Sequence, residues 1–153
     1  MIALAHATRL VAVPTLDALA HNAPADVPRV GVGLNLKRDR LWSAVYERQD
    51  DRVVAAGEPG LHTLEELLAQ AEGDRPLPLL GEAWPEVPAA LTGRVAKLDA
   101  TLSRVRAAAV WQVGRQRANA GAFVEPGALT PLYARRPEAV EKWQRLHGTP
   151  HGT

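Results

Sequence analysis

Apolar and polar residues alternate most regularly between residues 29 and 46. Val30, Val32 and Leu34 are separated by glycines, a polar stretch follows at 37–40, and residues 41–46 are again rich in apolar and aromatic side chains. A period of two places alternate side chains on opposite faces of an extended chain. We therefore expect an antiparallel hairpin with its turn at residues 37–40.

Other short apolar runs predict three more strands. Residues 10–13 form a run that ends at Pro14, residues 52–56 follow the hairpin, and residues 77–81 are apolar although Pro78 stands near their start. Short apolar runs of this kind, bounded by turn residues, are typical of buried strands. We expect a strand at each of the three places.

Two glycines remove side chains from one face of the first hairpin strand. They are Gly31 and Gly33. Glycine within a strand often marks a place where another group approaches the backbone closely. We expect a neighbouring helix there, with a ligand as the alternative.

One helix has both a start signal and a regular apolar face. Thr63 and Glu66 have the spacing of a capping box, in which each side chain bonds to the backbone of the other residue. Apolar residues follow at helical spacing, at positions 64, 67, 68 and 71. The pattern predicts an amphipathic helix that ends at Gly73.

Four further helices are predicted, at residues 16–21, 84–91, 102–120 and from Pro137 onward. We expect Thr15 to cap the first of them. In the long helix Ser103 is expected as a cap and Gly121 as the terminator. Its buried stripe is expected to comprise Leu102, Val105, Ala109 and Val113, and its opposite side carries Arg104, Arg115 and Arg117.

This order of elements predicts an α/β fold. Three antiparallel strands that lead into a helix and a further strand are the order of one lobe of a ribonuclease H-like, actin-like fold. We accordingly divide the chain into a remnant of a first lobe at residues 1–27, a second lobe at 28–147 and a disordered tail at 148–153. Residues 1–7 read as the end of a helix without a cap. Either the domain begins abruptly or residues that belong before Met1 are absent.

The composition of the chain excludes several classes of protein. The 153 residues include no cysteine, which excludes disulfide scaffolds, cysteine-ligated metal sites and thiol nucleophiles. No apolar run approaches the roughly 18 residues of a membrane-spanning helix, and no targeting signal is present. We expect a cytoplasmic protein.

Charge is balanced in total but uneven along the chain. The net charge is +1 overall, yet it is −5 over residues 1–93 and +6 over residues 94–153. The basic excess has two interpretations, a solvated helix face or a surface for an acidic partner. Aromatic residues also stand beside basic ones at 37–42 and 133–136. They would either stack on nucleic-acid bases or serve as core and interface anchors.

A search for catalytic and metal-binding motifs finds none that is complete. His147 and His151 have the spacing of two metal ligands, but Gly148 and Pro150 lie between them, so a metal site is not expected. The glycines at 31 and 33 lack the third glycine of a nucleotide-binding loop. The only serines, Ser43 and Ser103, have no histidine nearby in sequence and no nucleophile motif.

Three segments carry a resemblance to a known family. Residues 13–20, Val-Pro-Thr-Leu-Asp-Ala-Leu-Ala, resemble the segment V-S-T-L-E-A-L-A of the TsaB family. Residues 35–46 resemble the family hairpin D-A-R-R-G-E-V-Y-x-A-x-Y, and residues 131–137 resemble its C-terminal P-x-Y-L-R. The motif positions with an expected structural or interface role are Asn35, Arg38, Tyr46, Pro131, Tyr133 and Arg135. Asn35 stands where the family has aspartate, and the family's glycine-rich segment of the first lobe is not in this chain.

The resemblance implies a scaffold function. TsaB-like proteins are actin-like, non-catalytic partners of a glycoprotease-like homologue that binds metal and nucleotide and transfers a threonylcarbamoyl group to adenosine 37 of tRNA. An ATPase subunit joins this TsaD-like catalytic homologue. This chain would contact tRNA only indirectly, through these partners. The resemblance implies no cofactor and no metal held by this chain alone, no membrane, and a possible homodimer. Two alternatives remain, a divergent actin-like enzyme of the phosphotransferase or glycoprotease type, and a tRNA-binding module.

Overall fold

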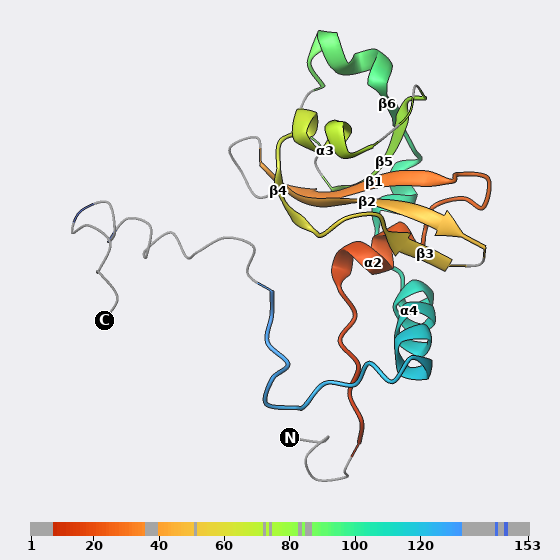
Figure 1. Ribbon diagram of the computed structural model, residues 1–153, viewed down its shortest axis with the longest axis vertical. Helices are drawn as coiled ribbons and strands as arrows, with labels where there is room; N and C mark the ends of the chain where they lie inside the picture. Colours follow the sequence, from red (N-terminus) through yellow and green to blue (C-terminus); the bar gives the residue numbers. More distant parts are fainter. Residues whose placement is uncertain are drawn as a thin grey trace.

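A mixed β-sheet forms the centre of the molecule (Figure 1). The computed structural model describes residues 8–35, 40–50, 52–71, 73, 75–82, 84, 87–132, 143 and 146. Helix α3 covers one face of the sheet, and α2 and α4 lie on the other side (Figure 1). The described part of the chain therefore has an α/β fold, as the sequence predicts.

The sheet combines antiparallel and parallel pairing. Its strands are β1 (Arg29–Asn35), β2 (Leu41–Gln49), β3 (Arg52–Ala55), β4 (Gly60–His62), β5 (Leu77–Glu82) and β6 (Val95–Lys97). The order is β3-β2-β1-β5-β6, and β4 shares the edge of β2 with β3. Strands β1, β2 and β3 form an antiparallel meander, whereas β5 runs parallel to β1. The predicted hairpin, third strand and 77–81 strand are confirmed, and β4 and β6 were not predicted.

α-Helices and 3-10 segments accompany the sheet in the described part of the chain. They are α2 (Thr15–Ala20), α3 (Leu64–Gln70), α4 (Ala107–Asn119), η1 (Ala89–Arg94) and η2 (Ala100–Ser103). The predicted helix after Thr63 is confirmed together with its capping box, although it ends at Gln70, before the predicted terminator Gly73. Gly121, with φ of 73°, follows the end of α4 as predicted.

Several helix boundaries were predicted wrongly. Pro14, not Thr15, occupies the N-cap of α2, and no side chain bonds there. Residues 89–94 form a 3-10 segment that begins after Pro88; the predicted helix at 84–91 cannot run through Pro88, which has no N–H to donate to the carbonyl four residues before it. Helix α4 begins only at Ala107, because η2 and the extended residue Arg106 precede it.

Two of the four residues expected to form the buried stripe of the long helix are buried on α4. Ala109 and Val113 are buried, but Val105 lies before the helix and is 50% exposed. Ser103 does not cap α4; its Oγ accepts a hydrogen bond from the Gly81 N–H at 3.0 Å. The side chain therefore joins η2 to the end of β5.

The run at residues 10–13 is not a strand of the sheet. Leu10 forms a single antiparallel bridge with Val124, and the four side chains are only half-buried. The prediction of a buried strand is therefore wrong within the described part of the chain. Residues 1–7 and the tail 148–153 lie outside the described residues, and the division of the chain at residue 27 stays a prediction.

Two apolar cores follow from the alternation along the strands. On one face α2 packs with β1, β2 and β5 through Leu16, Leu19, Ala20, Ala23, Val30, Val32, Ala44, Tyr46 and Leu80. On the other, α3 packs with β2 and β5 through Val45, Leu64, Leu67, Leu68, Leu77 and Leu79. Neighbouring residues of β2 thus enter opposite cores, which is the arrangement that a period of two predicts.

Thr63, which caps α3, should contribute more to the free energy of unfolding than Thr15, which caps no helix. Thr63→Ala should lower the free energy of unfolding by about 1 kcal/mol, because Thr63 Oγ1 accepts from the Glu66 N–H at 3.2 Å. Thr15→Ala should change it by less than about 0.5 kcal/mol, because Thr15 is exposed and caps nothing. Urea denaturation of both variants measures the difference, and equal losses would contradict the assignment.

Within the described ranges, no helix combines the length and apolar character that crossing a membrane requires.

Candidate functional site

Three distant segments meet at Asp17. Tyr46 of β2 donates its hydroxyl hydrogen to Asp17 Oδ1 at 2.8 Å, and Arg117 Nη1 of α4 donates to Asp17 Oδ2 at 3.0 Å. We call Asp17, Tyr46 and Arg117 the Asp17 network. It ties α2 to the sheet on one side and to α4 on the other.

Burial determines the protonation state of the Tyr46 hydroxyl in the Asp17 network. Tyr46 is 1% exposed, and burial followed by the negative charge of Asp17 raises its pKa well above its ordinary value. The hydroxyl therefore stays protonated as a donor to the carboxylate. A phenol held in this way is a structural group and not a general base.

The raised pKa of Tyr46 predicts a loss of stability in alkali. Because the unfolded tyrosine ionises near pH 10 and the folded one does not, the native state binds more protons above that pH. The stabilisation is complete below about pH 10 and should fall by about 1.4 kcal/mol per pH unit above it. Urea denaturation between pH 9 and 11 should show a shallower fall for Tyr46→Phe. Equal slopes for the variant and the parent would contradict this.

Further polar contacts hold α2 against the chain around α4. His21 Nε2 hydrogen-bonds to Gln112 Oε1. Asn22 Nδ2 donates to the carbonyl oxygens of Leu102 and Arg104, each at 2.9 Å. Arg117 thus lies on the side of α4 that faces α2, and the prediction that placed it opposite the buried stripe was wrong.

The structure describes only some of the motif positions singled out in the sequence. Tyr46 lies in the Asp17 network, and Asn35 ends β1, where its backbone pairs with Leu41. Pro131 is exposed and outside any helix or strand. Arg38, Tyr133 and Arg135 lie outside the described residues, so their roles stay predictions.

Sequence reasoning missed the partners of Tyr46. Asp17 carried a signal, because it is the one charged residue within the otherwise apolar run 16–20. Arg117 carried none, since it lies 100 residues further along the chain. The network nevertheless joins two of the segments that resemble the TsaB family, those at 13–20 and 35–46.

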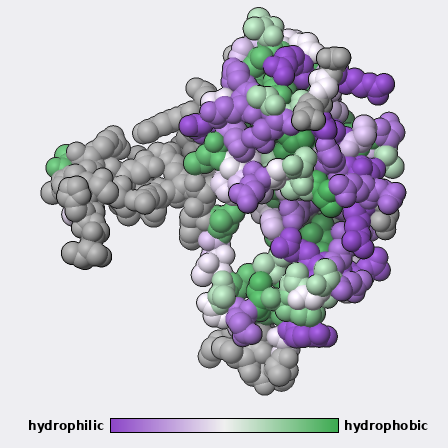
Figure 2. Space-filling view, in the orientation of Figure 1, coloured by the Kyte–Doolittle hydropathy of each residue, from purple (hydrophilic) through white to green (hydrophobic). Residues whose placement is uncertain are grey.

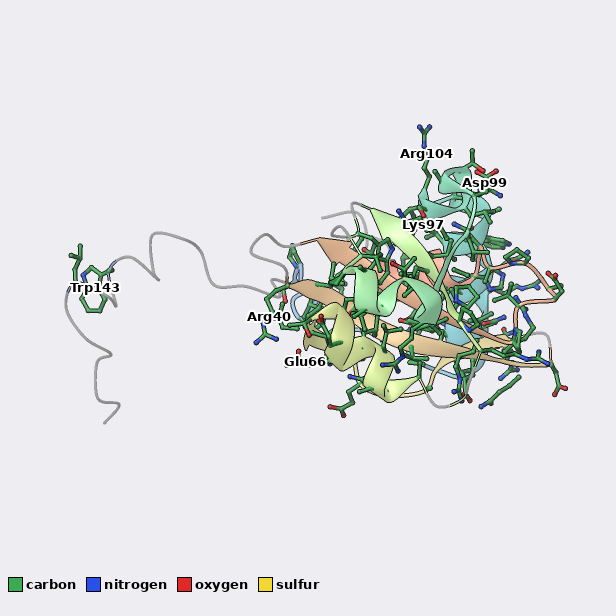
Figure 3. The ribbon with its side chains drawn as sticks, turned by 90° about the horizontal axis from the view of Figure 1, so that it is seen from above. Arg40, Glu66, Lys97, Asp99, Arg104 and Trp143 are labelled. Carbon is green, nitrogen blue, oxygen red and sulfur yellow. The ribbon has the colours of Figure 1, made fainter. Side chains whose placement is uncertain are left out.

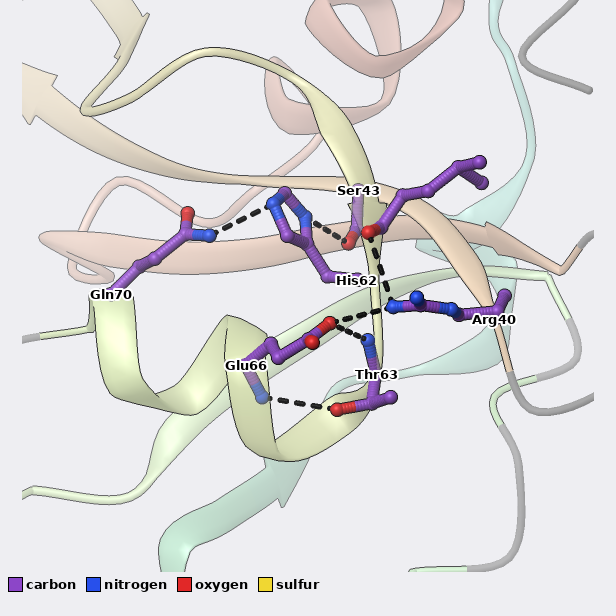
Figure 4. A network of polar contacts seen from close by, with 7 residues as sticks. Arg40, Ser43, His62, Thr63, Glu66 and Gln70 are labelled. Atoms are coloured by element: carbon purple, nitrogen blue, oxygen red, sulfur yellow. Dashed lines mark hydrogen bonds and ion pairs between the residues drawn. The ribbon is translucent and has the colours of Figure 1, made fainter.

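A serine and a histidine that are distant in sequence come together beside β4. Ser43 Oγ lies 3.1 Å from His62 Nδ1, and His62 Nε2 lies 2.9 Å from Gln70 Nε2 (Figure 4). A nucleophile needs access to its substrate as well as a base. Ser43 is 0% exposed, so this arrangement supports the packing of β2, β4 and α3 rather than catalysis.

Next to the contacts of Ser43, His62 and Gln70, charged contacts join Arg40 and Glu66 at the surface. Arg40 Nη1 donates to Glu66 Oε2 at 2.8 Å, and the same oxygen accepts from the Thr63 N–H at 2.8 Å (Figure 4). The Thr63 N–H, with Arg40 adding a smaller effect, holds the pKa of Glu66 below its ordinary value. Arg40 and Glu66 lie on one side of the molecule, and Asp99 and Arg104 lie on the opposite side (Figure 3).

The glycines of β1 make room for side chains of the protein itself. A Cβ at Gly31 would stand 2.9 Å from Leu77 and 3.4 Å from Leu67 of α3. A Cβ at Gly33 would stand 2.9 Å from the indole of Trp84. The expectation of a close neighbouring helix is met at Gly31, with leucines of β5 adding to it.

The described residues offer little for a small ligand. A groove of about 770 Å³ lies where β1 and β5 begin. Two of the arginines that line it already bind within the protein, since Arg29 pairs with Glu47 and Arg48 donates to the carbonyls of Ala23 and Pro24. Among the described residues no group of three or more His, Cys, Asp or Glu side chains is placed to hold a metal ion.

Solved structures share this fold. YeaZ from Pseudomonas aeruginosa matches with a TM-score of 0.69 and 21% identity over 86% of this chain and 62% of its own. A second structure, of an uncharacterized protein with similarity to peptidase YeaZ from the same organism, matches with a TM-score of 0.67 and 21% identity, over 88% of this chain and 62% of its own. YeaZ is the TsaB protein. This chain thus has the YeaZ fold and spans less than two thirds of the length of these neighbours.

No protein-family model and no curated protein matches the chain.

Proposed function

We propose that this chain is a TsaB-like accessory subunit in the threonylcarbamoylation of adenosine 37 of tRNA. The observation that carries the proposal is the YeaZ fold over 86% of the chain. The Asp17 network supports it, because the network joins two segments chosen for their resemblance to that family. A likeness in fold and a likeness in sequence motifs thus point to the same family.

The lobe is of the ribonuclease H-like, actin-like type in this proposal. An antiparallel meander of β1, β2 and β3 leads through α3 to β5, which runs parallel to β1. The order supports the assignment as the second of two lobes.

The chemistry of the described residues supports a non-catalytic role. The hydroxyl of Ser43 is buried, and the carboxylate of Asp17 is bound by Tyr46 and Arg117. An acid, base or nucleophile must be able to reach a substrate. These groups stabilise the fold instead, and the chain would act through a catalytic partner.

The partners in this proposal are a TsaD-like, glycoprotease-like catalytic subunit and an ATPase subunit, in the cytoplasm. The catalytic partner would hold the metal and the nucleotide, and tRNA would meet this chain indirectly. The alternative of a divergent phosphotransferase or peptidase requires this chain to bind nucleotide or to turn over substrate alone.

Binding and activity measurements separate the accessory role from the alternative of a divergent enzyme. The purified chain, mixed with the glycoprotease-like subunit encoded in the same genome, should form a complex detected by light scattering after size-exclusion chromatography. Alone it should hydrolyse neither ATP nor a peptide. An ATPase or peptidase activity that co-elutes with the chain through further purification would contradict the accessory role.

A further inference from the structure

We draw no further inference here: the strongest candidate, the patch of exposed apolar side chains that comprises Val110 and Trp111 of α4 and Phe123 just beyond it, at the end of the molecule where apolar side chains gather (Figure 2), carries no proposal, because nothing in the structure shows what covers it.

Discussion

Replacing Gly81 by alanine should lower the free energy of unfolding by about 3–5 kcal/mol, the combined effect of backbone strain and a forced steric clash. Gly81 has φ of 123°, a conformation that residues with a Cβ rarely adopt. A Cβ there would stand 1.8 Å from the carbonyl oxygen of Gly33, its register partner in the parallel pair of β1 and β5. The strands would have to separate to accommodate it.

Gly93→Ala is the matched control for Gly81→Ala. Nothing lies within 4 Å of a Cβ at Gly93. We expect a change within about 0.5 kcal/mol for this variant. Urea denaturation of both proteins measures the contrast, and a Gly81→Ala protein as stable as the parent would show that β1 and β5 do not approach as described.

Removing the carboxylate of the Asp17 network should have the second largest effect. Asp17→Ala leaves the buried Tyr46 hydroxyl without its acceptor and Arg117 without its ion pair. We expect a loss of about 2–4 kcal/mol, most of it from the phenol, since the side chain of Arg117 is 38% exposed and solvent screens its charge.

A double-mutant cycle tests whether that loss comes from the hydrogen bond between Tyr46 and Asp17. Tyr46→Phe and Asp17→Ala together should cost less than the sum of the single changes by about 1–2 kcal/mol, because both remove the same hydrogen bond. Arg40→Ala, which breaks an exposed ion pair with Glu66, should leave the free energy of unfolding close to that of the parent, because solvent screens both charges. Additive effects of the two network changes would show that Tyr46 and Asp17 act separately.

Local patterns predicted the parts of the fold that local interactions determine. The hairpin of β1 and β2 has a period of two, and α3 has a capping box at its start, so each could be assigned from neighbouring residues. Strands β4 and β6 have three residues each, too few to show a period, and they form because β2 and β5 offer open edges.

The remaining errors come from interactions between distant residues. Residues 10–13 have the composition of a buried strand, but a strand needs partners, and the described chain supplies one bridge from Val124. The start of α4 depends on Asp99, which caps η2 through the Thr101 N–H and makes a separate turn of the preceding residues.

Sequence reasoning recovered the candidate site only in part. Tyr46 could be singled out from its motif, but its acceptor Asp17 and the cation Arg117 reach it through the packing of α2, β2 and α4. In the same way, the contact of Ser43 with His62 exists only once β4 pairs with β2. Side-chain partners across elements follow from topology, which a single sequence does not show.

The threonylcarbamoyladenosine content of tRNA tests the proposed role most directly. Pseudomonas aeruginosa cells depleted of YeaZ, the protein whose fold this chain shares, would express either this chain or an empty vector. Digested tRNA would then be quantified by mass spectrometry. The modified nucleoside should rise above the empty-vector level in cells that contain the folded chain. A content equal to that of the empty vector, with the chain present and folded, would contradict the accessory role.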